Sequence, residues 1–234
     1  MADFTDLIAG LTGHEASSLD ISVESGSPYA EIIRKAEEMK ADLIVIPSGD
    51  SSETGLTMLG GITEMVVRYA PCPVLVSRPN SGEKRILAAT DFSDPSLPAI
   101  AMAAEEARRS NYTLTLLHSL DLTQAFEADL GGSQLNLRGL LAEYEIEEIT
   151  EQASRRLHEV LRSLNSEGEI IVSQEPPSQA IINAAVKIKA ELVVVGTSGK
   201  TGLIRWVLGS VAESVVRNSR CSTLVVRLHE YYKS

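Results

Sequence analysis

Residues 195–210 read Val-Gly-Thr-Ser-Gly-Lys-Thr-Gly-Leu-Ile-Arg-Trp-Val-Leu-Gly-Ser, and the rest of the chain can be understood outward from this stretch. A continuous apolar run at residues 192–195 leads into it, which is typical of a buried strand. Its glycines let the main chain approach a ligand closely, and Gly209 and Ser210 open an amphipathic helix. Because the first N–H groups of a helix favour negative charge, this strand, turn and helix start predict a phosphate-binding loop for a nucleotide.

The composition is that of an ordinary globular protein, with 44% apolar and 23% charged residues. The net charge of −11 argues against a nucleic-acid surface and against binding to anionic membranes. No stretch reaches the roughly 18 apolar residues of a membrane span, and the first residues show no signal-peptide pattern. Two cysteines in a chain of 234 residues do not suggest a secreted disulfide scaffold, although their spacing leaves a disulfide open. The sequence therefore predicts a cytoplasmic protein.

An internal repeat runs through the chain at a constant offset of 149 positions. Lys-Ala-Asp-Leu at residues 40–43 matches Lys-Ala-Glu-Leu at residues 189–192. Further on, the first copy has Gly60, Glu64, Val67, Arg68, Cys72 and Leu75 where the second has Gly209, Glu213, Val216, Arg217, Cys221 and Leu224. We predict a truncated first copy at residues 1–79, a linker at residues 79–82, and a complete second copy at residues 83–228. The first copy lacks the counterpart of residues 83–149.

Strands and helices alternate in the complete copy. The predicted strands lie at residues 85–90, 112–120, 170–172, 192–195 and 222–226. The first predicted helix ends near Asn111, and the other three lie at residues 140–164, 178–189 and 211–218. Residues 121–139 are polar and aperiodic, which indicates a surface excursion. Apolar rather than alternating strands favour a parallel sheet covered by helices on both faces. Ligands of such sheets bind at the carboxyl ends of the strands, where the strand order reverses.

Two motifs of the complete copy carry a resemblance to a known family. The first is Asp91-Phe92-Ser93 after the first strand, and the second is Gly196-x-x-Gly199, nine residues, then Gly209-Ser210. Together they resemble the ATP-binding branch of the universal stress proteins, and residues 83–228 resemble one such domain. The resemblance implies a five-stranded parallel sheet of order 3-2-1-4-5 between helices. In that order the strand that leads to Asp91 lies beside the strand that ends at Gly196.

The resemblance also implies a set of binding residues for ATP, with AMP or ADP as alternatives. Ala89, Thr90, Asp91 and Ser119 would hold adenine and ribose or border a metal; Val195, Gly196 and Gly199 would wrap ribose and phosphates; Gly209, Ser210 and Val211 would donate N–H groups and a hydroxyl to the phosphates. Asp91 would coordinate Mg²⁺ or Mn²⁺, directly or through water, because these cations take oxygen ligands. A departure from the family is Glu175, where the family often has glycine before a proline.

Several of these residues also have a structural interpretation. Ser210 and Glu213 have the spacing of a capping box, and we assign Glu213 to capping. Asp91 can cap the helix that follows it, although its place at a strand end favours function. His118 is expected to be a hydrogen-bonded sheet histidine rather than a base. Cys72 and Cys221 are expected to be packing residues.

The loop is not a Walker A loop, because that motif needs glycine five positions before the Gly-Lys pair and the sequence has valine at position 194. Lys200 either steers phosphates or lies solvated in the loop. Trp206 is expected to be a lid or a packing residue.

The first copy has lost the features of the loop. Pro47 replaces Gly196 and lacks an N–H group, and Gly61 replaces Ser210, so the hydroxyl is missing. Asp50 stands near the position of Gly199, where a carboxylate would repel phosphate. The sequence therefore predicts that the first copy binds no nucleotide.

The sheet of the first copy is incomplete, because its third strand at residues 22–24 is cut off from its fourth at residues 43–46. Either these two strands pair directly, or another chain fills the gap, or a longer chain exists that starts before Met1. Family members pair through their last strands, and residues 74–77 and 224–226 can do so within the chain or between chains. We expect a homodimer formed through these last strands.

The leading functional hypothesis is an ATP-binding regulatory protein of the universal stress type, with one site in the second copy. Hydrolysis would be slow, because no residue is placed to activate water. The alternative is a scaffold protein that binds no nucleotide and acts through its dimer surface. A third hypothesis, an enzyme that adenylates a substrate, lacks a catalytic constellation in the sequence.

Overall fold

The computed structural model describes residues 20–49, 60–79, 82–120, 143–197 and 208–227, with the backbone alone at residues 143–145. The first copy contains, in chain order, α2 (Pro28–Met39), β1 (Ile44–Pro47), α3 (Gly61–Tyr69) and β2 (Val74–Ser77). Pro28 stands in the first turn of α2, where its missing N–H group costs nothing, and Lys40 ends the helix in a left-handed conformation.

The second copy supplies the other elements. They are β3 (Glu83–Ala89), the 3₁₀ turn η2 (Asp94–Ser96), α4 (Leu97–Ser110), β4 (Thr113–Ser119), α6 (Glu143–Ser163), β5 (Glu169–Ser173), α7 (Pro177–Lys187), β6 (Ala190–Gly196), α8 (Ser210–Asn218) and β7 (Ser222–Val226). The expected strands and helices therefore form, with their ends shifted by a few residues. The predicted excursion at residues 121–139 lies outside the described residues.

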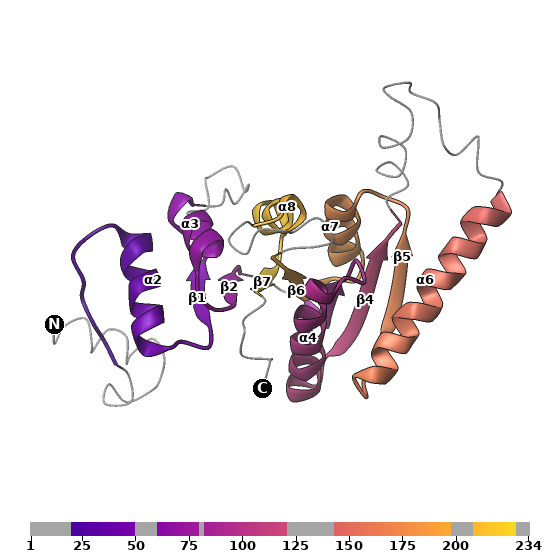
Figure 1. Ribbon diagram of the computed structural model, residues 1–234, viewed down its shortest axis with the longest axis horizontal. Helices are drawn as coiled ribbons and strands as arrows, with labels where there is room; N and C mark the ends of the chain where they lie inside the picture. Colours follow the sequence, from indigo (N-terminus) through magenta and orange to yellow (C-terminus); the bar gives the residue numbers. More distant parts are fainter. Residues whose placement is uncertain (1–19, 50–59, 80–81, 121–142, 198–207, 228–234) are drawn as a thin grey trace, which may run out of the picture.

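The seven strands of the described residues belong to one sheet of order β1-β2-β7-β6-β3-β4-β5 (Figure 1). The five strands of the second copy pair in parallel as expected, but the sheet as a whole has seven strands rather than five, because the first copy adds two strands and one antiparallel pair. The strands of the second copy run β5-β4-β3-β6-β7 within it, which is the order 3-2-1-4-5 read from the other end. The pairing of β3 with β6 confirms that the two strand ends expected to form a site are neighbours.

The antiparallel pair joins the two copies within one chain. Val74 pairs with Val225, Leu75 with Leu224 and Val76 with Thr223. β7 also pairs with β6, and β2 also pairs with β1, so both edges of each last strand are occupied. The expectation of a homodimer through these last strands is therefore corrected, because the strands pair with each other inside the chain.

Helices cover the sheet on two faces. Side chains of α2, α3, α7 and α8 form one apolar cluster with the strands, and those of α4 and α6 form another on the opposite face (Figure 1). Leu87 and Val193 are fully buried in the first cluster, while Ile86 and Val194 are buried in the second. Alternate residues of the central strands thus enter opposite cores, which explains why these strands are apolar throughout.

The outer edge of the sheet at β1 differs from the prediction. Residues 22–24, expected as the third strand, form no strand, and Val23 is 72% exposed. Within the described part of the chain β1 pairs with β2 alone, and Val45 on it is 61% exposed. Among the described residues, residues 22–24 have no neighbouring strand to bond with, and a strand needs such a partner for its backbone groups.

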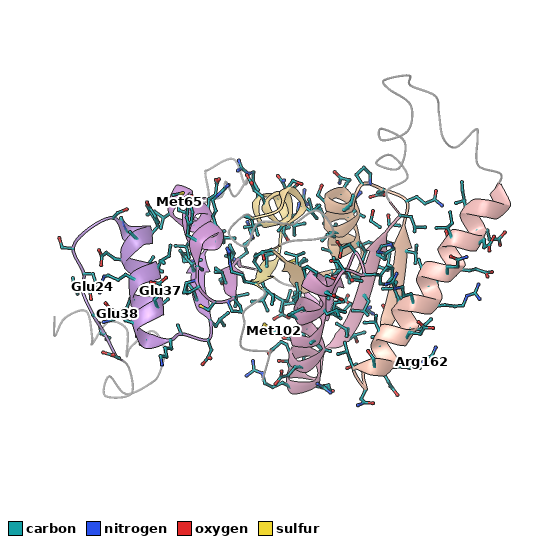
Figure 2. All side chains as sticks on the ribbon, viewed as in Figure 1. Glu24, Glu37, Glu38, Met65, Met102 and Arg162 are labelled. Carbon is teal, nitrogen blue, oxygen red and sulfur yellow. The ribbon has the colours of Figure 1, made fainter. Side chains whose placement is uncertain are left out.

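Charged side chains hold the segment before α2 against that helix. Arg34 forms ion pairs with Glu31 and Glu38 of α2 and with Glu24 of the preceding segment, and Figure 2 shows Glu24 and Glu38 beside α2. These contacts raise the pKa of the Arg34 guanidinium, chiefly through its hydrogen bond to Glu31. The cluster fixes the approach of residues 20–27 to the helix without a strand.

The joint between the copies is nearly symmetric in sequence and in contacts. Arg78 donates from Nη2 to the carbonyl oxygen of Val216 at 2.6 Å, near the end of α8. Its counterpart Arg227 donates to the carbonyl oxygens of Val67 (3.1 Å) and Arg68 (2.6 Å), near the end of α3. Each arginine thus binds the negative end of a helix from the other copy.

Burial lowers the pKa of both guanidinium groups of the joint, Arg78 and Arg227. Cys72 and Cys221 are buried free thiols, so no disulfide joins the copies and the packing interpretation holds.

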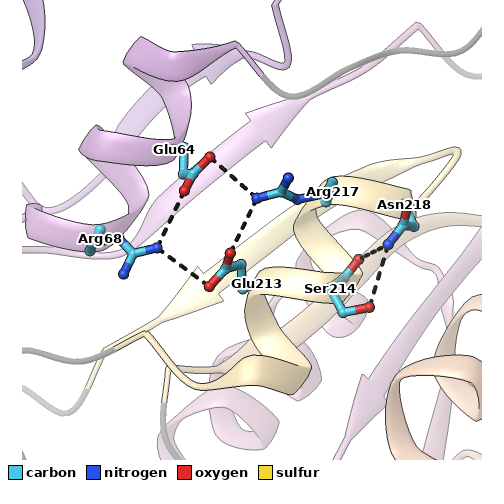
Figure 3. A network of polar contacts seen from close by, with 6 residues as sticks. All are labelled: Glu64, Arg68, Glu213, Ser214, Arg217 and Asn218. Atoms are coloured by element: carbon cyan, nitrogen blue, oxygen red, sulfur yellow. Dashed lines mark hydrogen bonds and ion pairs between the residues drawn. The ribbon is translucent and has the colours of Figure 1, made fainter.

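A closed ring of ion pairs lies over the same joint (Figure 3). Glu64 and Arg68 come from α3, and Glu213 and Arg217 come from α8. Each carboxylate contacts both arginines at distances from 3.1 to 3.4 Å. The ring therefore connects the two helices that follow the loop positions of the two copies. Among the described helices, none is long and apolar enough to cross a membrane.

Candidate functional site

The candidate site lies where β3 and β6 end. These parallel strands are neighbours, with Leu87 opposite Val193 and Ala88 opposite Val194. Ala89 and Thr90 therefore come out of the sheet beside Val195 and Gly196. Val195 is buried at 3% exposure, while Gly196 is half-buried. The structure brings these four predicted residues together at one edge of the sheet.

The turn after β3 holds Asp91 in a defined orientation. Asp91 Oδ1 accepts hydrogen bonds from the N–H and the hydroxyl of Ser93, the first at 3.0 Å. The side chain of Thr90 accepts from the N–H of Phe92 at 2.9 Å and bonds to the hydroxyl of Ser96 at the same distance. These bonds tie Asp91 to its own turn, and the N-cap residue of α4 is Ser96. The half-buried carboxylate of Asp91 is thus held by Ser93 directly after the end of β3.

The end of β4 adds two polar side chains to the same edge. His118 is 8% exposed, and its Nδ1 lies 2.8 Å from the carbonyl oxygen of Thr90. Because a carbonyl oxygen can only accept, Nδ1 carries the proton of this bond. His118 is therefore a hydrogen-bonded sheet histidine, as expected. Ser119, which we expected near ribose or metal, donates its hydroxyl to the carbonyl oxygen of Glu175 at 2.6 Å.

The start of α8 forms the other wall. Gly209 is the N-cap residue, and Ser210 is exposed in the first turn of the helix, where the first N–H groups have no partner within the helix. Gly209 donates its own N–H to the carbonyl oxygen of Thr197 at 2.8 Å. Its N–H is thus used within the protein, which corrects its expected role as a phosphate donor. Ser210 and Val211 keep that role as a prediction.

Gly209 instead allows a close approach of two backbones. A Cβ atom at this position would lie 3.1 Å from the carbonyl oxygen of Thr197. The equivalent bond exists in the first copy, where Gly60 donates to the carbonyl oxygen of Ser48 at 3.0 Å. Both copies therefore have the same hydrogen bond between the two ends of the loop, although their loop sequences differ.

The capping-box assignment of Glu213 is wrong. No side chain caps α8, and the carboxylate of Glu213 pairs with Arg68 and Arg217 in the ring described above. With Gly209 as N-cap, Glu213 stands one residue too late for a capping box. Gly199, Lys200 and Trp206 lie outside the described residues, as does Asp50 of the first copy.

The donor set suits a cation that is carried in by a nucleotide. Among the described residues, no group of three or more His, Cys, Asp or Glu side chains could hold a metal ion. Asp91 would supply a single carboxylate, which is how Mg²⁺ is often held when phosphates provide its other oxygen ligands. Asp91 thus fits a shared role with phosphate oxygens and does not fit a metal site built from protein alone.

A solvent-open pocket of about 670 Å³ lies along α6, away from the candidate site. Ile146, Thr150 and Ser154 of α6 line it together with Gln174, which follows β5. It does not include the residues at the ends of β3 and β6, so it is separate from the candidate site.

Two residues of the site region were missed from the sequence. Phe92 has a left-handed backbone with φ of 61°, and Arg156 of α6 lies over its ring. The position of Phe92 directly after Asp91 was a usable signal. Arg156 is 64 positions away along the chain, and no local pattern connects it to the site.

Known proteins resemble the chain in sequence and in fold. The universal stress protein MJ0531 of Methanocaldococcus jannaschii is 34% identical over 62% of this chain and 82% of its own length. The universal stress protein Mb2028c of Mycobacterium bovis is 28% identical over 80% of this chain, which spans only 62% of that relative's length. A universal stress protein structure from Archaeoglobus fulgidus covers 98% of the chain with a TM-score of 0.66 at 19% identity, which shows the fold.

Other matched universal stress proteins were solved as complexes with cAMP and with dAMP, each at a TM-score of 0.43. The sequence model of the Universal stress protein family matches residues 7–78 and again residues 83–227, which shows a tandem arrangement of the unit. With both copies matched, this chain belongs to the universal stress protein family.

Proposed function

We propose that this chain binds ATP at the carboxyl ends of β3 and β6 and acts as a regulatory protein. The observation that carries the proposal is the meeting of three features at one sheet edge. Asp91 follows β3, Gly196 ends the adjacent β6, and the start of α8 is tied to the end of β6 by the bond from Gly209 N–H to the carbonyl oxygen of Thr197. A carboxylate, a close backbone approach and a helix N-terminus are the parts from which nucleotide sites in parallel sheets are built.

The roles of the residues follow from their positions. The first N–H groups of α8 and the hydroxyl of Ser210 would bind phosphate oxygens. Asp91 would hold Mg²⁺ or Mn²⁺ together with those oxygens. AMP and ADP would occupy the same place with fewer phosphate contacts. Binding would bias a conformation or an assembly, and ATP hydrolysis is not part of the proposal.

The direct test is isothermal titration of the whole chain with ATP in the presence of Mg²⁺. Asp91→Asn removes the carboxylate charge while keeping its shape, and we expect the Kd to rise by about ten-fold because a charge-assisted contact is lost. Asp94→Asn is the matched control, since Asp94 is an exposed carboxylate three residues further on. We expect it to leave the Kd unchanged.

A second pair of variants uses the repeat as its own control. Gly209→Val places a branched side chain against the Thr197 carbonyl oxygen and should weaken ATP binding by more than ten-fold. Gly60→Val changes the equivalent position of the first copy, where the added Cβ would lie 3.9 Å from the Ser48 carbonyl oxygen, and should not alter the Kd. Absence of binding by the unmodified chain at millimolar ATP would refute the proposal.

The second candidate function is a scaffold that acts without nucleotide. The apolar side chains left exposed at the β1 edge favour it, with Leu43 44% and Val45 61% exposed. Exposed apolar surface of this kind marks interaction sites. If the chain fails to bind ATP and instead self-associates in sedimentation experiments, this second function is supported.

A further inference from the structure

Phe92 holds a backbone conformation that non-glycine residues rarely adopt. Its φ is 61°, and it directly follows Asp91. A bulky residue in this region is an outlier that the surrounding structure must hold in place, and such residues cluster at functional sites. Contacts from the surrounding structure must therefore keep Phe92 in this turn.

Two side chains from different elements contact the ring of Phe92. The imidazole of His118 on β4 lies 4.2 Å from it, centroid to centroid, at an interplanar angle of 38°. The guanidinium carbon of Arg156 on α6 lies 4.5 Å from the ring centroid, which is the distance of a cation–π contact. Arg156 Nη2 also approaches the carbonyl oxygen of Phe92 at 3.4 Å. Arg156 thus contacts both the ring and the backbone of the strained residue.

The contacts of Phe92 extend to the residues on both sides of Asp91. Thr90 accepts from the N–H of Phe92, and its carbonyl oxygen accepts from His118. Ser93 donates twice to the carboxylate of Asp91. Asp91 is therefore aimed by a turn whose most unusual dihedral angle is held by packing on Phe92. Arg156 is the one exposed side chain among the ring contacts described here.

We propose that Arg156 is a positioning residue of the nucleotide site, which through Phe92 holds the left-handed turn that aims Asp91 at its ligand. The inference rests on the proposed ATP site at the ends of β3 and β6. It gives α6 a part in that site, although Arg156 lies 64 positions from Phe92 in the sequence. Occupancy of the site and the placement of α6 are then linked through one cation–π contact.

The test compares the ATP affinities of three variants with that of the unmodified chain by isothermal titration with Mg²⁺. Arg156→Met keeps the length of the side chain and removes the cation, and we expect the Kd to rise by about three- to ten-fold. Arg156→Lys keeps a cation over the ring and should recover most of the affinity. Arg155→Met is the matched control, because Arg155 is the adjacent arginine on α6 and pairs with Glu151 instead. It should bind ATP as the unmodified chain does.

A double-mutant cycle separates positioning from a general loss of structure. In a Phe92→Leu background, Arg156→Met should change the Kd by less than two-fold, because its partner ring is already missing. The inference is overturned if Arg156→Met and Arg155→Met bind ATP with equal affinity, whether or not that affinity is weakened. It is also overturned if Arg156→Lys binds ATP no better than Arg156→Met. If the unmodified chain binds no ATP, the proposed function itself fails and this inference fails with it.

Discussion

Removing Glu213 from the ring of ion pairs tests whether these contacts hold the two copies together. Glu213 contacts Arg217 of its own helix at 3.1 Å and Arg68 across the joint at 3.4 Å. The side chains of Glu213 and Arg68 are about three-tenths exposed, so solvent screens the pairs in part. Partly exposed pairs contribute about 0.2–1 kcal/mol each, so Glu213→Gln should lower the free energy of unfolding by about 1 kcal/mol.

The assay is thermal and urea unfolding at low and high salt. For a chain of this size, about 1 kcal/mol corresponds to a decrease in Tm of roughly 2–4 °C. The difference should shrink in 1 M NaCl, because salt screens exposed charges. Glu151→Gln is the control, since Glu151 pairs with the more exposed Arg155 within α6. If Glu213→Gln costs no more than Glu151→Gln, or if salt leaves its cost unchanged, the ring does not stabilise the joint.

Two further predictions concern stability. Gly168→Ala should destabilise the protein by about 1–3 kcal/mol in urea titrations, because its Cβ would lie 2.7 Å from the carbonyl oxygen of Leu114; Gly61→Ala, with open space around it, should cost nothing, and equal costs would contradict the reasoning. Burial raises the pKa of the thiols of Cys72 and Cys221, so both should react slowly with a disulfide reagent until the protein unfolds. Their contribution to stability is complete below the ordinary thiol pKa of about 8.5 and is lost as pH rises above it; a urea midpoint that stays constant from pH 7.5 to 10 would argue against this.

The repeat made most of the fold predictable. A constant offset of 149 positions assigns the elements of one copy from the other, and the apolar strands indicate a parallel sheet with two covered faces. The sequence does not indicate whether Leu75 pairs with Leu224 within one chain or between two chains, because local patterns do not report which strand edges meet. The strand expected at residues 22–24 did not form, since β-propensity alone cannot supply a hydrogen-bonding neighbour.

The site was predictable where it depends on strand ends. Asp91 and Gly196 follow adjacent strands, so their meeting follows from the strand order. The role of Glu213 was not predictable, because its partner Arg68 lies 145 positions earlier and a capping pattern was present locally. The local pattern of a glycine at a helix start likewise predicts that the N–H of Gly209 binds a ligand. Its actual acceptor, the carbonyl oxygen of Thr197, depends on how the loop closes.

The two copies have the same residues at the joint between them but different residues at the loop, so holding the copies together and binding a ligand are separate roles. At the joint the copies match: Arg78 and Arg227 each bind the C-terminal end of a helix of the other copy, and Glu64 and Glu213 occupy equivalent places in the ion-pair ring. At the loop they do not match, since Pro47 stands where the second copy has Gly196.

Proline cannot donate a backbone hydrogen bond, so the edge of the first copy offers fewer donors to a phosphate. Its β2 nevertheless occupies the free edge of β7, which would otherwise expose a row of unpaired backbone groups. The first copy therefore serves the second by closing its sheet and by anchoring α8, the helix whose first turn is proposed to bind phosphate.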